Sequence, residues 1–157
     1  MLKNIFFDGF SLKNFIEIAN VNEKENFLET EKNIKFSDDN INKIKNINKN
    51  IYIVASVETW CPYARAFVAT VKRMAELNSK IHLSFVTMGR GFMDIAEILD
   101  IDEDDFVVPT AIILDEDFNF RKSFIGFPKK YSETGLAKNA NDYFKGLKAD
   151  EILDEII

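Results

Sequence analysis

The sequence predicts an α/β protein in which a mixed sheet of four to five strands is flanked by helices, with a helical extension at its N-terminus. Within residues 50–157, short β-branched apolar runs alternate with stretches whose apolar residues recur at helical spacing. The acidic turn Asp115-Glu116-Asp117 joins the last two runs and indicates a hairpin, whereas the first two are separated by a crossover helix. One parallel and one antiparallel pair together require a mixed sheet.

Each element of residues 50–157 is expected from its own pattern. We expect strands over 51–57, 81–87, 107–114 and 118–125, helices over 62–78, 92–99 and 136–147, and a final amphipathic stretch over 149–157. Gly89-Arg90-Gly91 is interpreted as a turn. His82, the only histidine, lies on the strand face opposite Ile81, Leu83 and Phe85, and a structural role is expected for it.

Residues 1–49 show helical spacing around 12–19, 23–31 and 41–47, and Ser37 is suited to cap the last of these helices. We therefore divide the chain into a helical extension, 1–49, and a main domain, 50–157. The extension is expected to pack on the main domain, and a partly mobile arm is the alternative.

Composition narrows the class of protein. The net charge of −6 argues against nucleic-acid or anionic-membrane binding, because both depend on basic surface. No apolar run approaches the ~20 residues of a membrane span. The single cysteine allows no internal disulfide, which is typical of the cytoplasm, and this is the location expected.

The most informative motif is Trp60-Cys61-Pro62-Tyr63-Ala64, which stands between a strand-like run and a helical pattern. A helix N-terminus stabilises a thiolate through its unpaired N–H groups and its dipole, and Arg65 adds a positive charge one turn on. The motif resembles that of the thioredoxin superfamily, Trp-Cys-x-x-Cys, with the Pro-Tyr interior of glutaredoxins. This sequence departs from it at Ala64, where the second, resolving cysteine would stand.

The resemblance covers residues 50–147 and implies a thioredoxin-like fold. It implies that Val108-Pro109-Thr110 contains a cis-proline beside Cys61, with Val108 pairing with a substrate strand, and that Gly126 lies near the active surface. Ala55 replaces a buried acid found in many thioredoxins. The implied function is thiol–disulfide exchange with Cys61 as the nucleophile. The implied partner is a disulfide-containing protein or a low-molecular-weight thiol, with no metal and no cofactor.

Several alternatives stay open at this point. Ala64 is either natural, as in monothiol proteins, or replaces the second cysteine of a Cys-Pro-Tyr-Cys motif. A non-enzymatic binding module is the second function considered, and iron–sulfur cluster carriage ranks lower because that class uses Cys-Gly-Phe-Ser. Seven carboxylates and no basic residue lie between Asp94 and Asp105, either as a solvated loop or as a surface that repels anionic thiols or selects a basic partner. The oligomeric state is not predicted.

Overall fold

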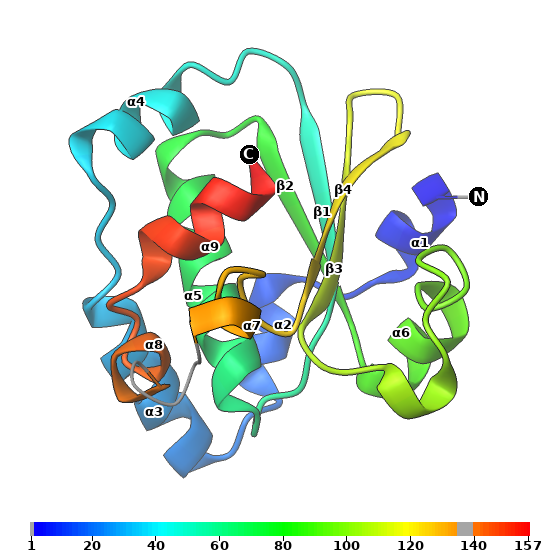
Figure 1. The fold of residues 1–157 in the computed structure, drawn as a ribbon, viewed down its shortest axis with the longest axis horizontal. Coiled ribbons are helices and arrows are strands. Elements are labelled where there is room, and N and C mark those ends of the chain that lie inside the picture. Colours follow the sequence, from blue (N-terminus) through cyan, green and yellow to red (C-terminus); the bar gives the residue numbers. More distant parts are fainter. Residues whose placement is uncertain (1, 135–139) are drawn as a thin grey trace.

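The computed structural model describes residues 2–134 and 140–157, which build a four-stranded mixed sheet between two layers of helices (Figure 1). The strand order is β2-β1-β3-β4. β1 pairs in parallel with β2 and antiparallel with β3, and β3 pairs antiparallel with β4. The predicted fold class is confirmed. The strands are β1 (Ile51–Ser56), β2 (Ile81–Val86), β3 (Thr110–Leu114) and β4 (Phe120–Ile125).

The helices cover both faces of the sheet (Figure 1). On one face the long helix α5 carries fully buried Phe67, which contacts Phe124 of β4, and α9 packs beside it. On the other face α1 and α6 lie over a smaller core that includes Ile5 and Val54. The helices are α1 (Leu2–Asp8), α2 (Leu12–Glu17), α3 (Val21–Lys32), α4 (Asp38–Lys45), α5 (Pro62–Leu77), α6 (Met88–Asp94), α7 (Tyr131–Thr134), α8 (Ala140–Phe144), α9 (Ala149–Ile156) and the 3₁₀ turn η1 (Glu103–Asp105).

The three helices predicted before residue 50 are present as α2, α3 and α4. Ser37 caps α4 as expected, and Asn20 and Glu23 form a capping box at the start of α3. Phe27 and Ile44 from these helices are buried in the same core as Phe67. Helix α1 was not predicted, because its apolar residues form a short run and no capping residue precedes them.

The interpretation of Gly89-Arg90-Gly91 as a turn is wrong, because these residues lie inside α6. The side chain of Thr87 caps that helix by accepting a hydrogen bond from the Arg90 N–H. A Cβ on Gly91 would fall 2.1 Å from the Ser56 hydroxyl oxygen, so glycine allows α6 to approach β1 closely. Tertiary packing thus outweighs the low helix propensity of glycine. The helix expected over 92–99 begins earlier and ends at Asp94.

Other boundaries differ by a few residues. The strand expected from 107 begins at Thr110, and the strand expected from 118 begins at Phe120, because Phe118 adopts a positive φ of 63° in the hairpin turn. The helix expected over 136–147 is described only from Ala140, where α8 runs to Phe144, and its first residues lie outside the described ranges. His82 faces away from Ile81 as predicted, stacking on Tyr52 and hydrogen-bonding Asn50.

Candidate functional site

Cys61 occupies the N-cap position of α5, the sixteen-residue helix that follows β1. Its Sγ accepts a hydrogen bond from the Ala64 N–H at 3.5 Å, and Pro62 forms the first turn of the helix, where no N–H is needed. The Ala64 N–H and the helix dipole both favour negative charge on the sulfur. The residue is only 5% exposed, so its neighbours cover almost all of the thiol.

The segment before β3 lies directly against this sulfur. The peptide bond between Val108 and Pro109 is cis, and the thiol of Cys61 donates to the Val108 carbonyl oxygen at 3.6 Å. The Thr110 hydroxyl donates to the Val107 carbonyl at 2.6 Å, and the Gly126 N–H donates to the Pro109 carbonyl at 2.7 Å. Within the described residues the Val108 N–H has no hydrogen-bond partner. The segment is therefore held rigidly while one main-chain donor stays free.

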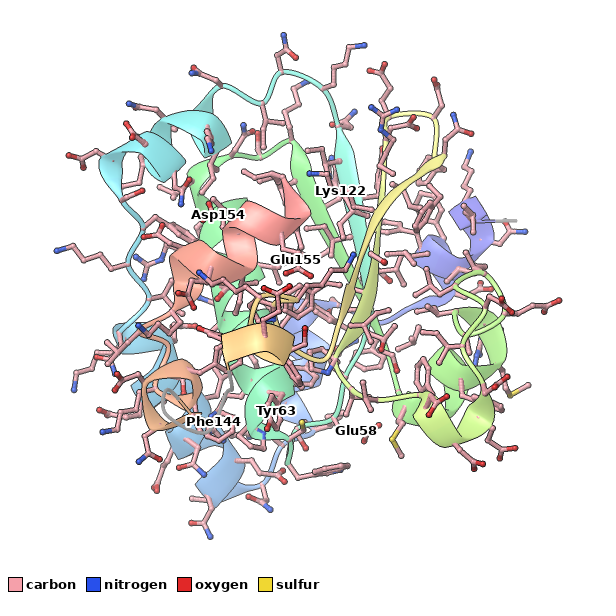
Figure 2. The ribbon with its side chains drawn as sticks, in the orientation of Figure 1. Glu58, Tyr63, Lys122, Phe144, Asp154 and Glu155 are labelled. Carbon is pink, nitrogen blue, oxygen red and sulfur yellow. The ribbon has the colours of Figure 1, made fainter. Side chains whose placement is uncertain are left out.

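The structure brings the residues singled out by the sequence to one end of the sheet, in different environments. Trp60 projects outward with 59% of its surface exposed. Tyr63 is half-buried and packs edge-to-face on Phe144 of α8, with ring centroids 4.9 Å apart (Figure 2). Ala64, in the first turn of α5 after Cys61, is completely buried.

Arg65 lies on the side of α5 that faces α3. Its Nε donates to the Thr30 hydroxyl at 3.1 Å, and that hydroxyl donates to the Phe144 carbonyl. Burial lowers the pKa of Arg65, and attraction to the nearby Cys61 thiolate opposes that shift. Among the described residues no carboxylate lies within ion-pair distance of Arg65, so its charge acts on the sulfur without a competing partner.

Two carboxylates hold the loop before Cys61, and sequence reasoning missed both. Glu58 Oε2 accepts from the Met88 N–H at the start of α6 at 2.7 Å, and Figure 2 shows Glu58 at the same edge of the molecule as Tyr63. Thr59 donates its hydroxyl hydrogen to Glu23 Oε1 of α3 at 2.9 Å. Their partners are 30 and 36 residues away in the chain, so no local signal marks them.

A pair of buried phenols lies behind Tyr63. The hydroxyls of Tyr131 and Tyr143 are both buried and have no hydrogen-bond partner among the described residues, and their rings meet edge-to-face at 5.8 Å. Burial, and secondarily the negative charge of Glu155, raises the pKa of Tyr143. Nothing in the sequence distinguishes these tyrosines from ordinary core aromatics.

None of the described helices is both long and apolar enough to cross a membrane. Across residues 2–134 and 140–157, no three His, Cys, Asp or Glu side chains are grouped so that they would hold a metal ion.

The fold defines a class of protein. A parallel β1–β2 pair joined by α5, followed by the antiparallel strands β3 and β4, is the thioredoxin-like arrangement. A family model described as thioredoxin matches residues 9–141, and the chain belongs to this family. The match begins before β1 and includes the helices α2 to α4.

Two solved structures share the fold. A protein of unknown function from Pseudomonas aeruginosa superposes with a TM-score of 0.90 at 18% identity, covering 98% of this chain and 93% of that one. An HIV epitope-scaffold superposes with a TM-score of 0.89 at 18% identity, covering 98% of this chain and 94% of that one. The search of curated proteins finds no match. At this identity the likeness extends to the fold alone.

Proposed function

We propose that this protein carries out thiol–disulfide exchange through its single thiol, Cys61. The observation that carries the proposal is the position of Sγ at the start of α5, 3.5 Å from the Ala64 nitrogen and 3.6 Å from the Val108 carbonyl oxygen. Thiol chemistry needs a stabilised thiolate beside a place where the substrate chain is aligned. Belonging to the thioredoxin family supports the same conclusion.

The two contacts of Sγ favour different protonation states. The thiol donates to the Val108 carbonyl, whereas the thiolate loses that bond and keeps the one from the Ala64 N–H. The unpaired Val108 N–H supplies a main-chain donor for an extended substrate segment, in the manner of strand addition. A partner that pairs there brings its own sulfur toward Cys61.

The reaction proceeds by two exchanges. The Cys61 thiolate attacks one sulfur of the partner disulfide, an S–S bond forms to Sγ, and the other partner sulfur leaves as a thiolate. Because Ala64 supplies no second thiol, an external thiol must attack the partner-derived sulfur of this mixed disulfide. That step restores the Cys61 thiolate and releases a disulfide between the external thiol and the attacked partner sulfur. Over the two exchanges the external thiol takes the place of the partner sulfur that left as a thiolate, so the numbers of thiols and disulfides are unchanged.

The direct test is reaction with 2-hydroxyethyl disulfide at pH 7, followed by mass spectrometry of the adduct. We expect the folded protein to form the mixed disulfide at least about tenfold faster than a short peptide with the sequence Trp-Cys-Pro-Tyr-Ala. Cys61→Ser should form none. A rate no greater than that of the peptide contradicts the proposal.

The matched variant Ala64→Cys tests the role of the missing thiol. Residue 64 lies on the first turn of α5 with its backbone nitrogen in contact with Sγ, so a thiol there is placed to attack the mixed disulfide. We expect this variant to release the adduct without added thiol, whereas the parent protein holds it until an external thiol is supplied.

A non-enzymatic binding module is the second candidate, and the burial of both Cys61 and Ala64 favours it. On that proposal Cys61→Ser leaves binding of a partner intact, whereas the exchange proposal requires the covalent step. The reducing cytoplasm is the compartment we propose for either activity, because the chain has one cysteine and no internal disulfide.

A further inference from the structure

The surface on the α6 and Val107 side of Cys61 combines exposed apolar side chains with negative charge that has no ion-pair partner among the described residues, whereas the Arg65 cation lies on the side of α5 that faces α3. We infer that the partner of Cys61 is a polypeptide thiol or disulfide flanked by lysine or arginine and not an anionic small thiol of the glutathione type. This inference rests on the proposed exchange activity and specifies its substrate class.

The apolar part of the surface consists of Trp60, Met88 and Val107, which are 59%, 41% and 43% exposed. They come from three segments that are linked to Cys61 through the chain or through one hydrogen bond. Trp60 precedes Cys61, Met88 is joined to the Cys61 loop through the carboxylate of Glu58, and Val107 precedes Val108. Large apolar side chains that stay exposed around a reactive group indicate contact with another chain.

The charged part of the surface adjoins Val107. Glu97, Asp100 and the run 102–105 are all exposed, and none of their carboxylates has an ion-pair partner within the described residues. The loop is packed against α6 by the edge-to-face contact of Phe106 with Phe92, at 6.1 Å. The one cation in residues 81–120, Arg90, is paired with Asp94 at 3.1 Å.

The sign of this charge decides between the two substrate classes. Like charges brought to a docking surface slow encounter and cost binding energy, whereas opposite charges speed it. Glutathione carries carboxylates that would approach this unpaired negative loop. A cationic segment would find apolar contacts at Trp60 and Val107 and opposite charge beside them.

The test uses two peptides that each have one cysteine and the same apolar residues, one with two lysines and the other with two glutamates. The cysteine of each peptide is joined to 2-mercaptoethanol in a mixed disulfide, and the two mixed disulfides are compared. Second-order rates of exchange with Cys61 are measured at low and high salt, with 2-hydroxyethyl disulfide as the uncharged reference. We expect the lysine peptide to react at least about tenfold faster than the glutamate peptide at low salt, with the ratio shrinking as salt rises. Glutathione disulfide should react more slowly than the uncharged reference.

A charge-matched pair of variants locates the effect. Glu103→Gln with Asp104→Asn should reduce the ratio of the two peptide rates by about threefold. Glu116→Gln with Asp117→Asn removes the same charge from the β3–β4 turn and should leave both rates unchanged.

The outcomes separate the inference from the exchange activity. Equal rates for both peptides, a faster glutamate peptide or an equal effect of the β3–β4 turn variant overturns the inference while exchange itself stands. Absence of exchange with the uncharged disulfide overturns the exchange activity, and the inference falls with it.

Discussion

The thiol of Cys61 and the main-chain carbonyl of Val108 lie 3.6 Å apart, although 47 residues separate them in the chain. The contact joins the start of α5 to the segment that enters β3. β1 and β3 are neighbours in the sheet, and Ser56↔Thr110 is their residue pair nearest the site. The residues just beyond the ends of these two strands must therefore meet. Pairing of these two strands therefore creates the candidate site.

Arg65 is expected to raise the reactivity of Cys61 through its charge, which has no ion-pair partner in the described part of the chain. Arg65→Met keeps much of the side-chain length but removes the guanidinium, so the thiolate loses a favourable electrostatic interaction. We expect alkylation of Cys61 by iodoacetamide at pH 7 to slow by about threefold to tenfold. Arg73→Met removes a charge from the same helix at a site that lies beside Glu76 and should leave the rate unchanged. Equal rates for both variants would contradict this role.

The hydrogen bond from Thr59 to Glu23 should hold the loop before Cys61 against α3. Thr59→Val keeps the shape and removes the donor, so a carboxylate oxygen loses a partner. We expect a loss of about 1–2 kcal/mol in the free energy of unfolding, measured by urea denaturation, and faster hydrogen exchange in residues 58–61. Thr59→Ser keeps the hydroxyl and should resemble the parent protein. An unchanged exchange rate in the valine variant would show that the loop is held by other contacts.

Gly126 has a φ of +73°, a conformation that L side chains adopt at a cost. Gly126→Ala is expected to destabilise the protein by about 1 kcal/mol. The nearest atom to a new Cβ is a Val107 methyl at 3.4 Å, so the effect comes from the backbone and not from a clash. The control Gly89→Ala lies in α6 with open space around it, and it should stabilise the protein by about 0.5–1 kcal/mol. Thermal denaturation of the two variants should therefore shift in opposite directions.

The buried hydroxyl of Tyr143 has no hydrogen-bond partner within residues 2–134 and 140–157, and it is expected to destabilise the protein. Tyr143→Phe removes that group and should raise the free energy of unfolding at pH 7 by about 1 kcal/mol. The raised pKa of Tyr143 adds a pH dependence. Above about pH 10 the unfolded chain releases the phenol proton while the folded protein retains it, so stability falls as pH rises, by about 1.4 kcal/mol per pH unit.

The phenylalanine variant should lack this contribution, and the difference between the two proteins should widen above pH 10. Urea denaturation from pH 7 to 11 measures both effects. The control Tyr52→Phe alters a part-exposed tyrosine on the other face of the sheet and should stay close to the parent protein at pH 7. Parallel stability curves for Tyr143→Phe and the parent protein would contradict the burial argument.

The repeating patterns of the chain were sufficient to predict its fold class. β-Branched runs predicted β1 and β2 nearly to the residue, the apolar spacing from Phe67 to Met74 predicted α5, and the acidic turn predicted the β3–β4 hairpin. α5 is visible in the sequence because one face of it is buried, and this imposes a period on its apolar residues. β1 is visible as a continuous apolar run because consecutive residues, which point to opposite faces of the sheet, are both buried. The motif around Cys61 marked the strand-to-helix junction because it stands between a strand-like run and a helical pattern, and both are local features of the sequence.

Long-range contacts decided what the patterns could not show. Helix α6 forms through Gly89 and Gly91 because Thr87 caps it and Gly91 packs on Ser56, and no local rule predicts that approach. The partners of Glu58 and Thr59 lie on α6 and α3, and the unpaired hydroxyl of Tyr143 arises from how α8 packs. Such contacts depend on which segments the completed fold brings together, and their energies are set by burial and distance in space.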